Sequence, residues 1–308
     1  MNAKVAPLDG ESLKSRIVEF ARGASTEIST HDEELLPALV NRLPAGTTVY
    51  VAHTPKASLD DVVRVASKAQ SLGFRASPHI VARRLESERS LRAALAELKE
   101  AGVEQVLLVA GDREQPLGPF TSTLEVIDSG ATVDAGIMSV GVAGHPEGHR
   151  AVGQTVLWNA LAHKQAFAER TGTKVHIATQ FGFNPEAFCA WGAHLVERGI
   201  TLPVAIGIAG HTPLPKLIKY AMACGVGASL GSLMKNMSAM TNLARMAVGP
   251  DQMMVGLLRG CVGTGSTRIV RPHLYAFGGV VATATWLRAV MDGNFELQPD
   301  SDKFVMNP

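Results

Sequence analysis

Four short polar motifs stand out because each follows an apolar run. They read Ser77-Pro78-His79, Ala110-Gly111-Asp112, His145-Pro146-Glu147-Gly148-His149 and Thr179-Gln180-Phe181. Imidazole, carboxylate and amide groups can move protons, stabilise a cation and hydrogen-bond a polar ring. The preceding runs are typical of buried parallel strands, whose carboxyl ends carry the chemistry of barrel enzymes. The motifs therefore predict one active site built from several strand ends.

Two carboxylates are candidates for chemistry. Glu27 lies in a short strand of small and β-branched residues, where burial would raise its pKa and make it a general acid near neutral pH. The alternative is a surface glutamate at a strand end. Asp112 follows a strand through Gly111, and it either orients a polar ring and stabilises a cation or serves as a turn or N-cap residue.

His145 and His149 have the i, i+4 spacing of a zinc-binding helix. Pro146 and Gly148 disfavour a helix there, and no carboxylate cluster completes a ligand set, so no metal is expected. A loop that presents imidazoles to a flat polar ligand is the preferred interpretation. His79 is either part of the same site or a core histidine.

Gln180 ends another apolar strand, and its amide offers a donor and an acceptor together. That combination suits the edge of a heterocycle such as a pterin or a flavin. Phe181 and Phe183 either wall the same pocket or belong to the core.

Strand and helix patterns alternate along the chain, and positioning these groups requires that alternation. Helical patterns cover 59–72 and 91–101, and eight strands are expected at 24–30, 47–53, 74–80, 105–110, 135–142, 174–180, 202–208 and 269–277. We expect an α/β protein with a single (β/α)8 TIM barrel over residues 1–308, whose first 20 or so residues form a leading helix or extension. A doubly wound sheet is the alternative, but the glycine-rich stretch 225–231 lacks the spacing of a dinucleotide fingerprint.

Composition excludes several classes of protein. With 29 basic and 28 acidic residues, the chain carries no basic field for nucleic acid. No signal peptide is visible, and the apolar stretch 274–287 is shorter than the roughly 20 residues that span a membrane. The odd, widely spaced Cys189, Cys224 and Cys261 predict reduced thiols in a cytoplasmic protein and not a disulfide framework.

Taken in order, the motifs resemble those of the methylenetetrahydrofolate reductase family, from about residue 24 to about 280. The family's Ala-Pro-His, Arg-Gly-Asp, Gly-Tyr-Pro-Glu-Gly-His-Pro and Thr-Gln-Phe-Phe-Phe-Asp correspond here to residues 77–79, 110–112, 144–150 and 179–184. Ala110, His145 and Asn184 depart from those motifs, and Ile28-Ser29-Thr30-His31 replaces the family's Phe-Phe-Pro-Pro after Glu27. The chain therefore looks like a divergent branch.

The resemblance implies a flavin-dependent reductase that interconverts 5,10-methylenetetrahydrofolate and 5-methyltetrahydrofolate, with FAD as cofactor and NADH or NADPH as co-substrate. Glu27 would be the general acid, Asp112 would stabilise the iminium cation, and Gln180 would hydrogen-bond the pterin. The implied substrate contacts are Gln180, Phe183, Lys216, Tyr220 and Tyr275. The implied cofactor contacts are His53, His79, Ala110, Gly111, Asp112, Phe120, Ser122, His145, His149 and Lys164.

Ala110 and His145 are departures among the flavin contacts, whereas Glu27, Asp112 and Gln180 are kept, so the sequence supports folate handling better than flavin affinity. A branch that holds flavin weakly, or that passes hydride directly from the nicotinamide, stays open. So do a metal-dependent barrel hydrolase or lyase using His79, His145, His149 and Asp112, and a non-catalytic folate-binding subunit of a methyl-transfer system. A homo-oligomer is possible, and the direction of the reaction, toward methionine biosynthesis or toward demethylation, is not fixed.

Overall fold

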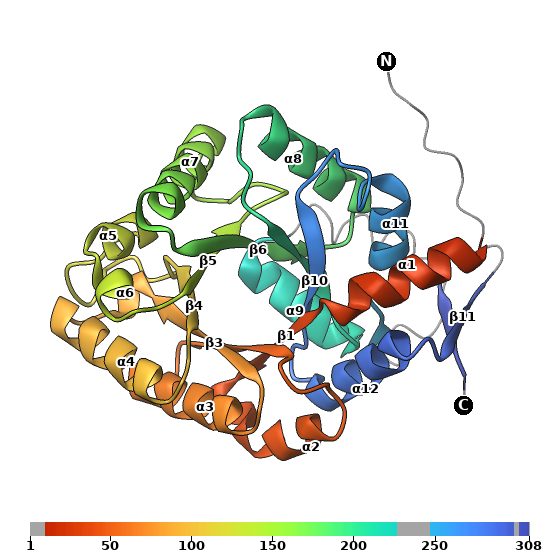
Figure 1. Ribbon diagram of the computed structural model, residues 1–308, viewed down its shortest axis with the longest axis horizontal. Coiled ribbons are helices and arrows are strands. Elements are labelled where there is room, and N and C mark those ends of the chain that lie inside the picture. Colours follow the sequence, from red (N-terminus) through yellow and green to blue (C-terminus); the bar gives the residue numbers. More distant parts are fainter. Residues whose placement is uncertain (1–9, 227–246, 299–301, 308) are drawn as a thin grey trace.

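Eight parallel strands close into a barrel in the computed structural model, which describes residues 10–226, 247–298 and 302–307 (Figure 1). Around the barrel the strands follow the order β1, β10, β7, β6, β5, β4, β3, β2. Their bounds are β1 (Ser25–Ser29), β2 (Thr48–Ala52), β3 (Arg75–Val81), β4 (Gln105–Val109), β5 (Ser139–Gly144), β6 (Lys174–Gly182), β7 (Val204–Ala209) and β10 (Ile269–Tyr275). The eight predicted strands and the TIM barrel are confirmed.

The alternation of large and small residues in β7 explains how a strand buried on both faces fits the barrel. Val204, Ile206 and Ile208 belong to the main hydrophobic core with residues of the surrounding helices. The intervening positions are small, and Gly207 faces the backbone of β6, where a Cβ atom would meet the carbonyl oxygen of Gln180 at 2.7 Å. Small residues on this strand leave interior space for larger side chains from its neighbours.

A ring of helices covers the outside of the barrel (Figure 1). The ring contains α1 (Gly10–Arg22), α2 (Leu36–Val40), α3 (Leu59–Ser71), α4 (Glu88–Glu100), α5 (Thr123–Asp128), α6 (Ala131–Asp134), α7 (Gln154–Thr171), α8 (Pro185–Glu197), α11 (Asp251–Gly260) and α12 (Val280–Met291), and the 3-10 turns are η1 (Thr30–Leu35) and η2 (Ala82–Arg84). The leading helix α1 packs against α11 and α12 and so closes the ring. Among the described residues, no helix combines the length and apolarity that crossing a membrane requires.

The connection after β7 differs from the others because its first helix, α9 (Leu214–Cys224), is not part of the outer ring. Leu217 and Ala221 of α9 pack on Phe181 and Ala209, which lie at the carboxyl ends of β6 and β7. The helix therefore covers one side of the barrel mouth (Figure 1). Two short strands, β8 (Thr212–Pro213) and β9 (Ala247–Val248), pair antiparallel, and most of the glycine-rich stretch 225–231 lies outside the described residues.

A C-terminal hairpin packs beside α12. It consists of β11 (Phe295–Leu297) and β12 (Phe304–Met306), paired antiparallel. The Phe304 ring stacks on Trp286 of α12, and its backbone N–H donates to the carboxylate of Asp251 at the start of α11. The hairpin thereby ties the last two helices of the ring together.

The expectation of three reduced thiols is wrong. Cys189 of α8 and Cys261, just after α11, form a disulfide, with Cα atoms 5.6 Å apart and 72 residues between them in the sequence. Spacing along the chain could not reveal this pair, because only the packing of α8 against α11 brings the two residues together. Cys224 is the free cysteine.

We expect reduction of this bond to lower the free energy of unfolding by about 4 kcal/mol, since a cross-link over so long a loop restricts the unfolded chain. Urea unfolding with and without a thiol reductant measures the difference, and Cys189→Ser provides the matched variant. Titration of thiols in the unfolded, unreduced protein should find Cys224 alone. Three reactive thiols there would contradict the pairing.

Candidate active site at the barrel mouth

Glu27 of β1 is the carboxylate at the centre of the mouth. Its Oε2 lies 3.3 Å from Nε2 of His79 on β3 and 3.8 Å from Nε2 of His273 on β10. The Glu27 side chain is 18% exposed, and its Oε2 atom is buried. Strands far apart in the sequence thus supply one carboxylate and two imidazoles to the same spot.

The electrostatics of Glu27 differ from the sequence expectation. Burial raises its pKa, as predicted, but the polar contacts with the imidazoles of His273 and His79 outweigh burial and bring the pKa down to about 2. Glu27 is therefore ionised near neutral pH in the unliganded protein. The sequence motifs included His79 but not His273, which lies beside the same carboxylate.

Two buried hydrogen bonds inside the barrel lie next to this group of side chains. Ser25 Oγ lies 2.9 Å from Nδ1 of His273, and both side chains are fully buried. With the serine hydroxyl donating to Nδ1, the Nε2–H of His273 faces Glu27. On β2, in register with Glu27, the hydroxyl of Tyr50 is hydrogen-bonded to Nε2 of His176 at 2.7 Å. The interior thus holds the imidazole of His273 in one orientation.

A β-bulge sets the position of Gln180. The register between β6 and β7 shifts between Ala178 and Phe181, and the backbone N–H of Gly207 donates to Thr179 Oγ1 instead of to a strand carbonyl. Bulges of this kind redirect side chains next to active sites. The Oε1 atom of Gln180 accepts from the N–H of Phe181 at 3.0 Å, which leaves the amide nitrogen available to a ligand.

A group of four aromatic side chains, which we call the aromatic wall, covers the mouth between β6, β10 and α9. Tyr275, Phe277 and Tyr220 are stacked in sequence, with centroid distances of 5.7 and 4.7 Å, and Phe181 packs against Phe277. The Tyr275 hydroxyl donates to the carbonyl of Thr179. Tyr220 is 40% exposed, so part of this surface is free to stack on a planar ligand.

Phe277 adopts a backbone φ of +45°, a conformation that is rare outside glycine. Such residues persist only where the surroundings determine them, and they gather at functional sites. Phe183 contacts Phe181 edge to face, whereas Lys216 lies farther out, with Nζ beside Gly278. The implied substrate residues thus lie around one aromatic wall, with Lys216 at its rim.

Asp112 lies on the opposite side of the mouth. Gly111 precedes it with a φ of +92°, and a Cβ there would collide with Val81, so glycine is required at this turn. Asp112 Oδ1 accepts from Nη2 of Arg84 at 3.0 Å. Burial raises the pKa of Asp112, but the Arg84 guanidinium offsets this, so the pKa stays below the ordinary value and the carboxylate is ionised.

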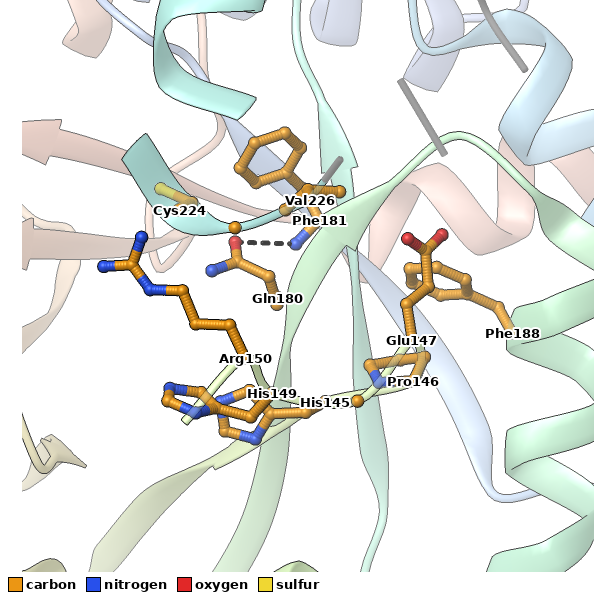
Figure 2. A pocket seen from close by; sticks show the side chains of 12 residues that line it. His145, Pro146, Glu147, His149, Arg150, Gln180, Phe181, Phe188, Cys224 and Val226 are labelled. Atoms are coloured by element: carbon orange, nitrogen blue, oxygen red, sulfur yellow. Dashed lines mark hydrogen bonds between the residues drawn. The ribbon is translucent and has the colours of Figure 1, made fainter. Parts of the chain in front are cut away.

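The imidazoles of the motif that follows β5 lie next to Gln180 (Figure 2). His145 and His149 pack edge to face with centroids 5.0 Å apart, and they line a small cavity with Gln180, Arg150 and Cys224. Burial lowers the pKa of His145 to about 4, with smaller contributions from His149 and Lys164. Both rings therefore face this cavity largely as neutral hydrogen-bonding groups.

The remaining implied cofactor residues occupy varied positions. Lys164 of α7 is 6% exposed near His145, and His53 is buried where β2 leads into α3. Phe120 belongs to the hydrophobic core, and Ser122 is the N-cap of α5. Ala110 is exposed, and its carbonyl accepts the N–H of Arg83.

The histidines do not form a metal site within the part of the chain that the structure describes. No group of three or more His, Cys, Asp or Glu side chains there is arranged to hold a metal ion. Asp112 pairs with Arg84 and His79 pairs with Glu27, so the set suggested for a metal-dependent hydrolase is divided among separate contacts.

The buried imidazoles predict acid-sensitive stability. Burial lowers the pKa of His53 and His145 to about 4 and that of His176 to about 3, against an ordinary value of 6.5. Below pH 6.5 these histidines bind protons in the unfolded chain but stay neutral in the folded chain. Their contribution to the free energy of unfolding is therefore fully present above that pH and declines as the pH falls toward these values. Glu27, with its lowered pKa, adds a separate loss only below pH 4.5.

Because of His176 alone, the free energy of unfolding should be roughly 2 kcal/mol lower at about pH 5 than at about pH 7.5. Urea unfolding at the two pH values measures the difference. A free energy of unfolding that is equal at both would contradict the burial of these rings in their neutral form.

Three residues at the site were missing from the sequence interpretation. His273 had a usable signal, because it alternates with Tyr275 on a predicted strand and so faces the same side. Phe277 and Arg84 had none, since the first depends on an unusual backbone angle and the second on a partner 28 residues away.

Comparison with known proteins decides the family. A family model described as "Methylenetetrahydrofolate reductase" matches residues 29–252, more than half of the chain. The chain belongs to the methylenetetrahydrofolate reductase family. Membership indicates an oxidoreductase that acts on a folate. The matched residues contain the motifs of β3 to β6, whereas Glu27 and the β10 residues lie outside them and are placed by the barrel geometry.

Two solved structures are similar to this member of the methylenetetrahydrofolate reductase family. Dihydropteroate synthase (FolP) from Thermus thermophilus is 16% identical, with 87% of this chain and 92% of that chain covered and a TM-score of 0.48. Triosephosphate isomerase from Bartonella henselae is 10% identical, with 88% and 98% covered and a TM-score of 0.42.

Proposed function

We propose that this protein interconverts 5,10-methylenetetrahydrofolate and 5-methyltetrahydrofolate by hydride transfer, with FAD as cofactor and NADH or NADPH as co-substrate. The observation that carries the proposal is the Glu27 carboxylate at the barrel mouth, in contact with His79 and His273. Opening the methylene bridge requires a proton on a folate nitrogen, and a carboxylate coupled to imidazoles is suited to deliver one. The family match supports the same reaction.

Because Glu27 is ionised in the unliganded protein, the proton must come from its neighbours or arrive with the substrate. A folate over the mouth would exclude water from the Glu27 carboxylate and raise its proton affinity. His79, 3.3 Å away, is placed to pass a proton to Glu27, and Ser25 orients His273 behind it.

The opposite wall would stabilise positive charge. Ionised Asp112 lies at the edge of the mouth, where it would favour the iminium formed when the bridge opens. Gln180 would offer its amide to the pterin, and Tyr220 would stack on the ring system. The role of Asp112 uses the ionised form that its contact with Arg84 favours.

The β5 side of the mouth fits a negatively charged cofactor. Burial lowers the pKa of Lys164 to about 8, and no carboxylate among the described residues contributes to that value. An anion beside Lys164 would compensate its buried charge, and Arg150 and His149 line the small cavity next to His145, the residue whose pKa Lys164 affects. We therefore infer that these residues hold the phosphates of FAD, which when bound supplies hydride transfer between nicotinamide and folate.

The absorbance spectrum of the purified protein tests the flavin, and turnover of both folates with NADH or NADPH tests the reaction. We expect a flavin spectrum that NADH bleaches and methylenetetrahydrofolate restores, with ping-pong kinetics. Turnover that is identical with and without added FAD, in protein without flavin absorbance, would overturn the role of FAD. Absence of turnover of either folate under all these conditions, although folate binds, would favour a non-catalytic folate-binding subunit.

A further inference from the structure

A second cavity lies outside the barrel mouth, between α3 and α4. Its volume is about 520 Å³, within the range of roughly 300–1,000 Å³ that is typical of ligand pockets. His53 and Asp112 line its inner end, so the cavity continues outward from the mouth. We call it the α3–α4 groove. A ligand that reacts at the mouth and extends past Asp112 would run into this groove.

Two guanidinium groups lie at the inner end. The Arg84 side chain is 10% exposed, with Nη1 donating to the carbonyl of His53 at 2.9 Å and Nη2 donating to Asp112. Arg113 follows on the β4 loop and also lines the groove. Arginine presents five N–H donors, so Arg84 retains donors beyond these two contacts, and paired guanidinium groups are suited to phosphate oxygens.

His53 contributes an acceptor that lacks a partner. The residue is 8% exposed, and its Nε2 lies 3.1 Å from the carbonyl of Ala57, so Nε2 carries the proton. Nδ1 is then a buried acceptor with no hydrogen bond from the described part of the chain. Burial lowers the pKa of His53 to about 4, which keeps that lone pair free at neutral pH. A ligand hydroxyl in the groove would be a suitable donor for this acceptor.

The outer part of the groove is acidic over a small apolar floor. Asp60, Glu86 and Glu97 line it, and none of them forms an ion pair with a described residue. On α4, Ser90, Ala93, Ala94 and Glu97 present one face with room for a flat ring. Carboxylates accept the hydroxyls of an adenosine ribose in dinucleotide sites, and they disfavour a 2′-phosphate.

We propose that the α3–α4 groove binds the adenosine diphosphate moiety of NADH, with the pyrophosphate at Arg84 and Arg113 and the ribose at the outer carboxylates, and that it selects NADH over NADPH. The inference rests on the proposed function. FAD carries the same moiety, but Lys164 on the other side of the mouth is the better partner for its phosphates. The acidic rim also excludes the glutamate tail of a folate.

Ala93→Trp tests occupancy, because it fills the groove from an exposed position of α4. Ala96→Trp is the matched control, since Ala96 is exposed on the same helix outside the groove. We expect ADP-ribose to bind the wild type and Ala96→Trp in calorimetry, and Ala93→Trp to bind about tenfold more weakly or not at all. Equal binding to all three proteins, or binding to none, would overturn the proposal.

Glu97→Lys tests selectivity, with Glu100→Lys on the same helix as control. Removing a negative charge and adding a positive one beside the ribose should lower the NADH/NADPH ratio of kcat/KM by about tenfold, whereas Glu100→Lys should leave it unchanged. The binding of ADP-ribose and of its 2′-phosphorylated form, measured without turnover, should change in the same direction. A ratio unaffected by Glu97→Lys would exclude the groove as the source of selectivity.

Flavin content shows whether NADH or FAD supplies the adenosine diphosphate moiety that binds the groove. Binding and turnover, measured together, show whether the groove proposal or the proposed function fails. If Ala93→Trp loses FAD while its KM for NADH stays at the wild-type value, the NADH assignment is wrong. If the protein reduces methylenetetrahydrofolate but the groove variants bind ADP-ribose normally, the groove proposal fails and the function stands. If ADP-ribose binding follows the groove variants but no folate is turned over, the function fails and the groove remains a nucleotide site.

Discussion

Glu27→Gln is expected to reduce the rate of methylenetetrahydrofolate reduction by about 10²- to 10⁴-fold, the usual contribution of a positioned acid or base. The amide keeps the size of the side chain but cannot carry the proton that moves between Glu27 and His79. Reduction of the flavin by NADH needs no such proton and should stay near the wild-type rate. Rapid-mixing measurements of the two half-reactions distinguish these effects.

Glu27→Asp provides the comparison for this variant. It retains a carboxylate but withdraws it from His79 and His273, so we expect activity between those of the wild type and Glu27→Gln. An equal loss in both half-reactions of Glu27→Gln would mean that the residue supports the structure of the mouth instead of proton transfer. Folate binding without turnover in the wild type would remove the catalytic role altogether.

Asp112→Asn is expected to lower the rate of the folate step by about 100-fold, because a fixed negative charge beside the developing cation is lost. Arg84→Lys should cause a smaller loss, since lysine keeps the positive charge but cannot bridge Asp112 and the His53 carbonyl in the same way. The folate half-reaction measures both effects.

Asp134→Asn is the matched control for Asp112→Asn. Asp134 is also an exposed aspartate paired with an arginine, Arg92 on α4, but it lies on α6 outside the mouth. We expect its folate step to match the wild type. A similar loss in both aspartate variants would assign the effect of Asp112 to stability and not to charge at the site.

The sequence was sufficient to predict the barrel and the end of the barrel at which the candidate site lies. Parallel strands buried on both faces leave uninterrupted apolar runs, and the polar residues that follow must meet at one end. His145, His149 and Gln180 were placed together on this reasoning, and they do line one cavity. The covering position of α9 was not predictable, because a helical pattern does not say where its apolar face packs.

The charge state of Glu27 could not be read from the sequence. Burial alone favours the neutral acid, whereas two imidazoles from other strands favour the carboxylate, and the balance depends on contacts of 3.3 and 3.8 Å. The ion-pair partner of Asp112 could not be predicted from the sequence either. Ala110 removes the arginine expected next to this aspartate, and Arg84 supplies a guanidinium from the neighbouring strand end.

The disulfide between Cys189 and Cys261 has a topological consequence. It converts the segment from α8 to α11 into a covalent ring that contains β7, α9 and the chain up to β9. A protease that cuts once inside this ring opens the backbone but releases no fragment until the bond is reduced. Nicked protein would therefore migrate as one species without reductant and as two with it, and the aromatic wall would stay attached to the barrel after the cut.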